Sequence, residues 1–239
     1  MLPVAIQPRM ITDTTPETGV APVTLTAFRS FLSARRSTRQ FLQEDVPDDV
    51  IRVLHDAAGL TPSGGNARAY QVTMLPRGRT RESLMRELQR IYAARSALLN
   101  NPLLRAAAAP FAGPYVRAFL RDGEYGPRMA RLLGKLRRGE DPLFYSAPVV
   151  FFFHSRALIP TPREDCVIAA FAVSLAAQAA GLGCCLVTLA QSAVNASRRC
   201  KELLGMSADS SVHAVLVLGR AASPAEERPA RAPIPLHCV

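Results

Sequence analysis

Three arginines and two hydroxyl residues lie within five positions, Arg35-Arg36-Ser37-Thr38-Arg39. A guanidinium presents a planar fork of N–H donors that matches a phosphate, and a serine hydroxyl adds a further donor. Segments of this composition also occur on the solvated surfaces of arginine-rich proteins. Taken by itself, this basic segment predicts either a compact anion site or an ordinary cationic surface.

A glycine-rich segment, Thr61-Pro62-Ser63-Gly64-Gly65-Asn66, follows farther along the chain. Its two glycines let the backbone approach a planar ligand, and Asn66 offers both a hydrogen-bond donor and an acceptor. A loop between a helix and a strand has the same composition without any ligand. The two segments are more specific as a pair, because an amphipathic helical pattern over 46–60 separates them.

Other residue types give weaker candidates. The four histidines have no metal-ligand spacing and the five cysteines include no Cys-x-x-Cys pair, so no metal site is predicted. Cys184-Cys185 could form a redox pair, but cysteines in an apolar stretch are usually small core residues. Asp165 fits either the start of a proton relay or the acidic first turn of a helix. No Ser-His-Asp arrangement is found, and no side chain is assigned as catalytic.

The elements that must position these residues follow from periodicity and turn signals. Helices are predicted over 25–33, 46–60, 80–99, 163–180 and 192–204, with shorter helices over 102–138 interrupted at Pro110, Gly113-Pro114 and Gly126-Pro127. Strands are predicted over 70–75, 147–153, 184–188 and 213–218. The elements alternate without the regular spacing of a doubly wound sheet, which indicates an α+β or three-layer α/β/α class.

An uncharged stretch in the second half of the chain could be a membrane span or a buried helix. Residues 166–190 carry no charge and are numerous enough to span a bilayer. The break at Gly181-Leu182-Gly183 instead favours a buried, alanine-rich helix followed by a turn and a short strand, so no membrane span is expected. This Gly-x-Gly follows a helix and lacks a third glycine, which argues against a dinucleotide-binding fingerprint.

Composition limits the class further. The 239 residues are 49% hydrophobic, enough for one sizeable core, and carry a formal net charge of +10. Thirteen arginines and one lysine between residues 76 and 139 oppose four acidic residues, which accounts for that whole charge. Such a region favours an anionic substrate, an acidic partner or a solvated helix face, and without an RNA-binding aromatic motif no nucleic-acid partner is expected.

Residues 1–24 are interpreted as a mobile or interface arm without a secretory leader, and the unpaired thiols suit the cytoplasm.

The order of these landmarks resembles the FMN-dependent nitroreductase family. The family patterns R-R-S-x-R-x-F and P-S-x-x-N are matched by residues 35–41 and 62–66, and an alanine-rich helix ending in G-L-G is matched by 175–183. Leu218-Gly219 and a basic tail at 228–231 complete the order. The resemblance implies one domain over 25–239 with a mixed β-sheet flanked by helices, an intertwined homodimer, and a helical, arginine-rich insertion at about 77–142.

The resemblance also implies contacts with FMN. The basic segment, through Arg35, Arg36 and Ser37, would hold the phosphate together with Arg231 of the tail. Arg39 would lie near the pyrimidine edge of the flavin, where a fixed guanidinium stabilises the negative charge of the reduced ring.

Two further groups complete the implied site. Four residues of the glycine-rich segment would approach the flavin from the other subunit: Pro62, Ser63, Gly64 and Asn66. Thr188 and Leu189 would supply a backbone N–H towards the reactive flavin nitrogen. This sequence departs from the pattern here, because many members have glycine where this chain has Thr188-Leu189-Ala190.

The implied activity is reduction of an electron-poor small-molecule acceptor, such as a nitroaromatic or a quinone, by NAD(P)H in a ping-pong cycle. The flavin carries that chemistry, which fits the lack of a catalytic dyad. Two alternatives stay open. The segment Gly59 to Gly65 also resembles flavin dehydrogenases of azoline-containing peptides, although Asn66 departs from their motif, and a non-catalytic flavin-binding module with an acidic partner has the same cofactor contacts.

Overall fold

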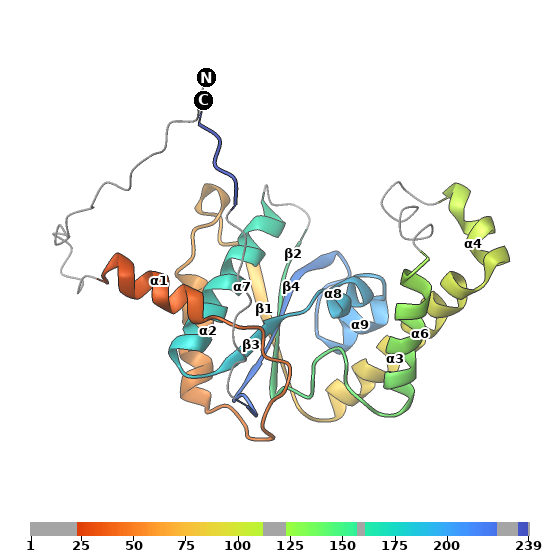
Figure 1. Cartoon of the computed structure of the whole chain (residues 1–239), viewed down its shortest axis with the longest axis horizontal. Helices are drawn as coiled ribbons and strands as arrows, with labels where there is room; N and C mark the ends of the chain where they lie inside the picture. Colours follow the sequence, from red (N-terminus) through yellow and green to blue (C-terminus); the bar gives the residue numbers. More distant parts are fainter. Residues whose placement is uncertain (1–22, 112–122, 157–160, 224–233, 239) are drawn as a thin grey trace. The chain divides into compact units, whose positions relative to one another are not determined.

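The computed structural model describes residues 23–111, 123–156, 161–223 and 234–238 (Figure 1). The chain divides into two compact units, Met1–Arg35 and Arg36–Val239. In the first unit, helix α1 (Leu25–Ala34) begins at Thr24, whose hydroxyl oxygen accepts a hydrogen bond from the Ala27 N–H at 3.2 Å. This N-terminal cap is the one expected for a threonine that precedes an apolar helical repeat.

The second unit contains the sheet and the remaining helices. Its described helices are α2 (Asp48–Gly59), the 3-10 turn η1 (Gly64–Asn66), α3 (Arg79–Asn100), α4 (Pro102–Ala108), the 3-10 turn η2 (Ala109–Phe111), α6 (Tyr125–Arg137), α7 (Pro162–Ala179), α8 (Thr188–Asn195) and α9 (Arg198–Leu203). Its strands are β1 (Tyr70–Pro76), β2 (Val149–Arg156), β3 (Gly183–Leu186) and β4 (Ser210–Gly219).

The four strands of the described residues form one sheet in the order β1-β2-β4-β3, and every neighbouring pair runs antiparallel. The expected mixed character is therefore confined, among the described residues, to an isolated parallel bridge between Ser37 and Cys184. Thr73 pairs with Phe152, which pairs in turn with Val215 of β4. This register places the apolar run of β2 in the middle of the sheet, where both of its faces must be covered.

Successive side chains of β2 enter two different cores. Val150 and Phe152 belong to a cluster with residues of α3, α6, α8 and α9, whereas Phe151 and Phe153 belong to a second cluster built largely from α2 and α7. Because side chains of a strand alternate between its faces, the sheet lies between two helical layers. Figure 1 shows α2 and α7 on one side of the sheet and α3, α6, α8 and α9 on the other, which confirms the three-layer α/β/α class.

Two local predictions were wrong. The helix expected over 192–204 is two helices, α8 and α9, because Ser197 caps the second one by accepting a hydrogen bond from the Cys200 N–H at 3.2 Å. Gly126-Pro127 does not interrupt a helix but lies in the first turn of α6, where proline needs no N–H partner.

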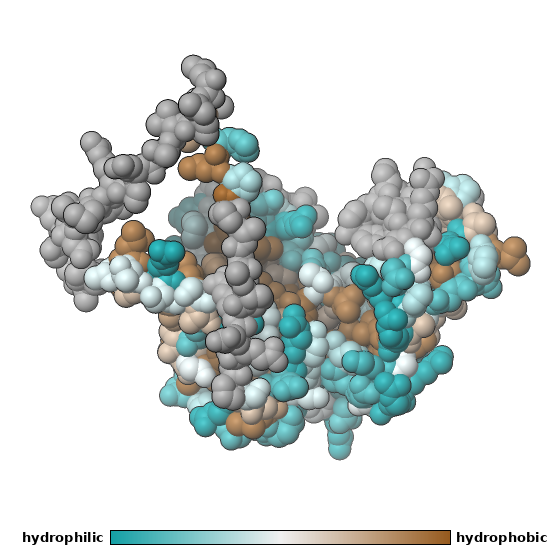
Figure 2. All heavy atoms as spheres, viewed as in Figure 1, coloured by the Kyte–Doolittle hydropathy of each residue, from teal (hydrophilic) through white to brown (hydrophobic). Residues whose placement is uncertain are grey.

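The charge-free stretch 166–190 is divided among α7, β3 and α8. No helix in the described ranges is long and apolar enough to cross a membrane. Polar side chains instead gather over α3 and α6 (Figure 2), where exposed Arg128, Arg131 and Lys135 follow one face of α6.

Candidate functional site

The basic segment runs alongside β3. Ser37 forms the parallel bridge with Cys184, and the Thr38 N–H donates to the Cys184 carbonyl oxygen at 2.9 Å. A Cβ atom added to Gly183 would lie 2.5 Å from the Thr38 hydroxyl oxygen. The last glycine of the Gly-x-Gly turn is therefore required by the close approach of the basic segment, a packing reason that the sequence alone did not provide.

The other flank of the basic segment pairs with the chain that leaves β4. The Leu42 N–H donates to the Arg220 carbonyl at 2.9 Å, and the Ala222 N–H donates to the Gln40 carbonyl at 3.0 Å. Phe41 also forms an antiparallel bridge with Ala221. Residues 37–42 are thus held on both sides by backbone contacts.

The predicted phosphate contacts differ in where the structure places them. Arg36 is half-buried, and Ser37 and Arg39 are exposed in the second unit. Arg35 ends the first unit, where its backbone N–H donates to the Leu32 carbonyl at 3.3 Å. Arg231 lies outside the described residues.

The glycine-rich segment is attached to the start of α7. Asp165 is 3% exposed, and its Oδ1 atom accepts hydrogen bonds from the Gly64 N–H and from the Thr161 hydroxyl, each at 3.0 Å. A Cβ atom at Gly64 would lie 2.0 Å from the Thr161 hydroxyl oxygen. Of the two interpretations of Asp165, the acidic first turn is confirmed, and the carboxylate also holds the loop.

Within this loop, the polar side chains predicted to meet the flavin make contacts with Arg68. The Ser63 hydroxyl accepts from the Arg68 N–H at 2.9 Å, and the Asn66 side-chain oxygen accepts from the Arg68 Nε–H at 3.3 Å. Asn66 has a φ angle of 55°, a left-handed conformation that asparagine tolerates better than most residues. Pro62 precedes them on the exposed side of the loop.

Thr188 and Leu189 form the first two positions of α8, immediately after β3. Val187 precedes the helix without a side-chain cap, and its own N–H donates to the Val215 carbonyl at 2.9 Å. The N–H groups of the first helical turn have no intrahelical partner, so they can donate to a polar or anionic ligand. The structure therefore retains the backbone donors expected here, although glycine is absent.

The two halves of the predicted site attach to different places on one helix. Gly64 binds Asp165 in the first turn of α7, whereas Cys184 of β3 donates its Sγ–H to the Ser174 carbonyl at 3.6 Å. An α-helix rises 1.5 Å per residue, so these attachment points lie about 14 Å apart along α7. The chain thus brings the basic segment close to the start of α8 and holds the glycine-rich loop elsewhere.

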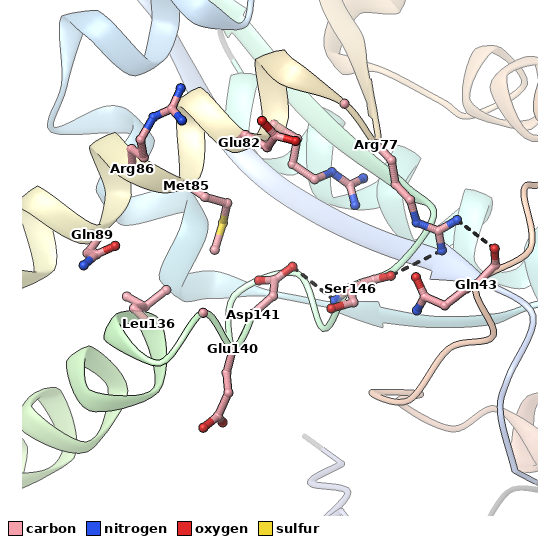
Figure 3. Close-up of a pocket in the computed structure, with 13 residues that line it drawn as sticks. Gln43, Arg77, Glu82, Met85, Arg86, Gln89, Leu136, Glu140, Asp141 and Ser146 are labelled. Carbon is pink, nitrogen blue, oxygen red and sulfur yellow. Dashed lines mark hydrogen bonds between the residues drawn. The ribbon is translucent and has the colours of Figure 1, made fainter.

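A separate cavity of about 580 Å³ lies between the start of α3 and the chain that precedes β2 (Figure 3). None of the predicted cofactor contacts lines it. Arg77 donates to the Gln43 and Ser146 carbonyls at 3.2 and 3.4 Å, and Asp141 accepts from the Ser146 N–H at 3.1 Å (Figure 3). These charges already hold the surrounding backbone, so the cavity is a weaker candidate for an anionic cofactor than the basic segment.

Arg81 lies at the base of this region and is 7% exposed. Its guanidinium donates to the Leu75, Ala147 and Pro148 carbonyls and lies 6.0 Å from the centroid of the Phe144 ring. Burial lowers the pKa of Arg81 to about 10. The side chain joins β1, α3 and the entry to β2, a structural role that its position in an arginine-rich segment did not predict.

The model of the Nitroreductase family matches residues 32–220. A comparison with curated proteins finds no significant match. The solved structures similar to this chain include a nitroreductase with bound FMN from Bacteroides fragilis, with 17% identity over 85% of this chain and 94% of that chain, at a TM-score of 0.62.

Two further structures extend the comparison. The FMN-dependent nitroreductase NfnB from Mycobacterium smegmatis, solved in complex with NADPH, is 23% identical over 82% of this chain and 88% of that chain, at a TM-score of 0.57. An iodotyrosine deiodinase bound to FMN and 3-iodo-L-tyrosine is 18% identical over 88% and 98%, at a TM-score of 0.58. At these identities the structures show a shared fold. The family model itself spans the basic segment, the glycine-rich loop and the start of α8, and this chain belongs to the nitroreductase family.

Proposed function

We propose that the protein is an FMN-dependent oxidoreductase that accepts hydride from NAD(P)H and reduces an electron-poor small molecule. The observation that carries this proposal is the backbone pairing of residues 37–38 with Cys184. It sets a cationic segment beside the strand that leads directly into the uncapped first turn of α8. Phosphate donors and ring-edge donors on adjoining segments suit a flavin nucleotide.

The residues of this chain divide the task. Arg36 and Ser37, with Arg35 and Arg231, would bind the phosphate, and Arg39 would stabilise negative charge at the pyrimidine edge. The N–H groups of Thr188 and Leu189 would orient the ring. FMN, when bound, supplies two-electron transfer, so the protein needs to bind, orient and exclude water.

We also propose that two copies share each site. Val167, Ile168 and Phe171 expose 41%, 42% and 43% of their surfaces on α7, the helix that holds the glycine-rich loop through Asp165. A second copy that covers these side chains would bring its own loop, with Pro62, Ser63, Gly64 and Asn66, towards the first copy's flavin. The antiparallel packing of one helix on its copy is a self-complementary contact of the kind that closes a twofold dimer.

The acceptor is assigned only by class. The segment 77–142, which includes α3 and α6, would cover the site and select the acceptor by charge, since most of the exposed charged side chains in its described parts are arginines. Nitroaromatics, quinones and 3-iodo-L-tyrosine form a suitable first panel, because the similar structures include nitroreductases and a deiodinase.

The first test is an absorbance spectrum of the purified protein, followed by anaerobic addition of NADPH and then NADH. We expect flavin bands that bleach with at least one nucleotide and return when an acceptor is added. Bound flavin that neither nucleotide reduces would favour the azoline dehydrogenase. Bound and reducible flavin that no acceptor reoxidises would favour the non-catalytic module. Protein that cannot be reconstituted with FMN would refute the proposal.

The shared site is tested by Ile168→Glu, with Arg163→Glu on the same helix as the matched control. We expect the first variant to sediment as a monomer and lose FMN, because a buried carboxylate cannot be tolerated in an apolar contact. The control should stay dimeric and yellow. A monomeric protein that retains FMN in full would contradict the shared site.

A further inference from the structure

Helix α3, from the arginine-rich segment, makes a specific polar contact with the first turn of α8. Tyr92 is completely buried, and its hydroxyl donates to the Leu189 carbonyl oxygen at 2.8 Å. A buried tyrosine hydroxyl needs a hydrogen-bond partner, because an unsatisfied buried polar group is costly. Here the partner is one of the two residues proposed to orient the flavin.

A second chain of donors ends on the same oxygen. Arg95, one turn after Tyr92, donates from Nη1 to the Ser192 hydroxyl and from Nη2 to the Ser192 carbonyl, both at 3.0 Å. The Ser192 hydroxyl then donates to the Leu189 carbonyl at 3.1 Å. The Arg95 guanidinium also lies 5.3 Å from the centroid of the Tyr92 ring, so the two residues support each other.

These contacts act on peptide groups that face the proposed ligand. The Leu189 carbonyl shares a peptide plane with the Ala190 N–H, one of the first-turn donors of α8 that lack an intrahelical acceptor. Hydrogen bonds in series polarise one another, so two hydroxyl donors on the carbonyl make the N–H on the other side of the plane a better donor.

We propose that Tyr92 and Arg95 are positioning residues that, through Leu189 and Ser192, fix the first turn of α8 and favour the reduced flavin. This inference rests on the proposed function, because it assigns the α8 amides to the flavin. It also connects the segment expected to select the acceptor with the segment expected to tune the cofactor. Neither Tyr92 nor Arg95 belongs to any motif in the sequence.

The test compares flavin midpoint potentials of the wild-type protein, Tyr92→Phe and Arg95→Gln, each loaded with FMN. Tyr92→Phe keeps the buried ring and removes one hydrogen bond, so the equilibrium constant for flavin reduction should fall about three- to tenfold. A tenfold change corresponds to about 30 mV for a two-electron couple. The dissociation constant of oxidised FMN should change less than twofold, whereas that of reduced FMN should rise by the factor by which the reduction equilibrium falls. Hydride transfer from saturating NADPH should slow in parallel with the potential.

Tyr145→Phe is the matched control, because Tyr145 packs against the same core cluster from the loop before β2. Its potential should equal that of the wild-type protein. If Tyr92→Phe does not fold, Ser192→Ala at an exposed position interrupts the Arg95 chain and should give the same shift. Unchanged potentials in flavin-loaded variants would overturn the inference and leave the proposed function intact. A wild-type protein without FMN binding would instead refute the proposed function and this inference together.

Discussion

Substitution of Gly64 by alanine tests how the glycine-rich loop is held. The new Cβ would lie 2.0 Å from the Thr161 hydroxyl oxygen and 3.1 Å from the Thr161 Cβ. Ordinary van der Waals contact begins near 3.4 Å. The Thr161 side chain must therefore move, and its 3.0 Å hydrogen bond to Asp165 is lost.

The magnitude follows from two terms. Inserting a methyl group into a packed site costs about 1–3 kcal/mol, and losing a hydrogen bond to a charged group costs about 1.5–3 kcal/mol. Partial relaxation reduces their sum, so we expect the free energy of unfolding to fall by about 3 kcal/mol. That is a large share of the roughly 5–15 kcal/mol that stabilises a typical domain.

The assay is urea unfolding followed by circular dichroism, with Gly59→Ala as the matched control. Gly59 ends α2 with no atom within 4 Å of an added Cβ, so that variant should be unchanged or more stable by up to about 1 kcal/mol. In a Thr161→Ala background the Gly64→Ala change should cost only about 1 kcal/mol, because the clashing hydroxyl is gone. Equal midpoints for Gly64→Ala and the wild-type protein would refute the packing argument.

Three further predictions concern buried groups. Arg81→Met should lower the free energy of unfolding by about 3 kcal/mol or more in urea, because three buried carbonyls lose a donor, whereas exposed Arg79→Met should change it by less than about 0.5 kcal/mol. Burial lowers the pKa of His154, as does the charge of His213, so the unfolded chain binds more protons than the folded protein. The free energy of unfolding should therefore decline as pH falls below the ordinary histidine value of 6.5. His154→Gln should flatten this dependence in urea titrations repeated over a series of pH values. A thiol reagent should modify Cys238 alone among the five cysteines of the native protein and all five in denaturant, and fast reaction of a second native thiol would contradict the described burial.

The sequence predicted the elements wherever the apolar pattern was continuous. The run that became β2 was identified because a strand buried on both faces needs apolar residues at consecutive positions. Its end was misplaced, since β2 continues through buried His154 and Ser155. One polar atom of this extension has a partner, because the Thr73 hydroxyl lies 2.9 Å from the His154 Nε2 atom. That partner is distant in sequence and invisible to a local pattern.

For the candidate site, too, the local residue patterns were predicted and the contacts between distant residues were not. Its segments were found from residue types, because guanidinium groups, glycines and an acidic first turn carry their chemistry locally. The contacts that position them were missed: the pairing of Thr38 with Cys184, and the hydrogen bonds that Asp165 and Tyr92 make. Each joins residues far apart along the chain, and each involves a residue type that is common in ordinary cores and helix termini.

The two halves of the proposed site are held by different contacts: the basic segment by Cys184 of β3, and the glycine-rich loop by Asp165 of α7. Each half can therefore be damaged separately in the proposed homodimer. One variant, Ser37→Ala with Arg39→Ala, damages the half of a site that its own chain provides. Another, Asp165→Ala, releases the loop that serves the partner's flavin, because Gly64 loses its acceptor.

Each variant alone should form dimers with two damaged sites. In a mixed dimer, twofold symmetry places both defects in one site and leaves the other site intact. Random pairing of equal amounts should therefore restore about one flavin site in four, measured as bound FMN after co-expression and purification of all dimers. If the loop served the flavin of its own chain, every site of every dimer would carry a defect, and mixing would restore none. The recovered fraction thus decides whether the two attachment points on α7 serve one flavin or two.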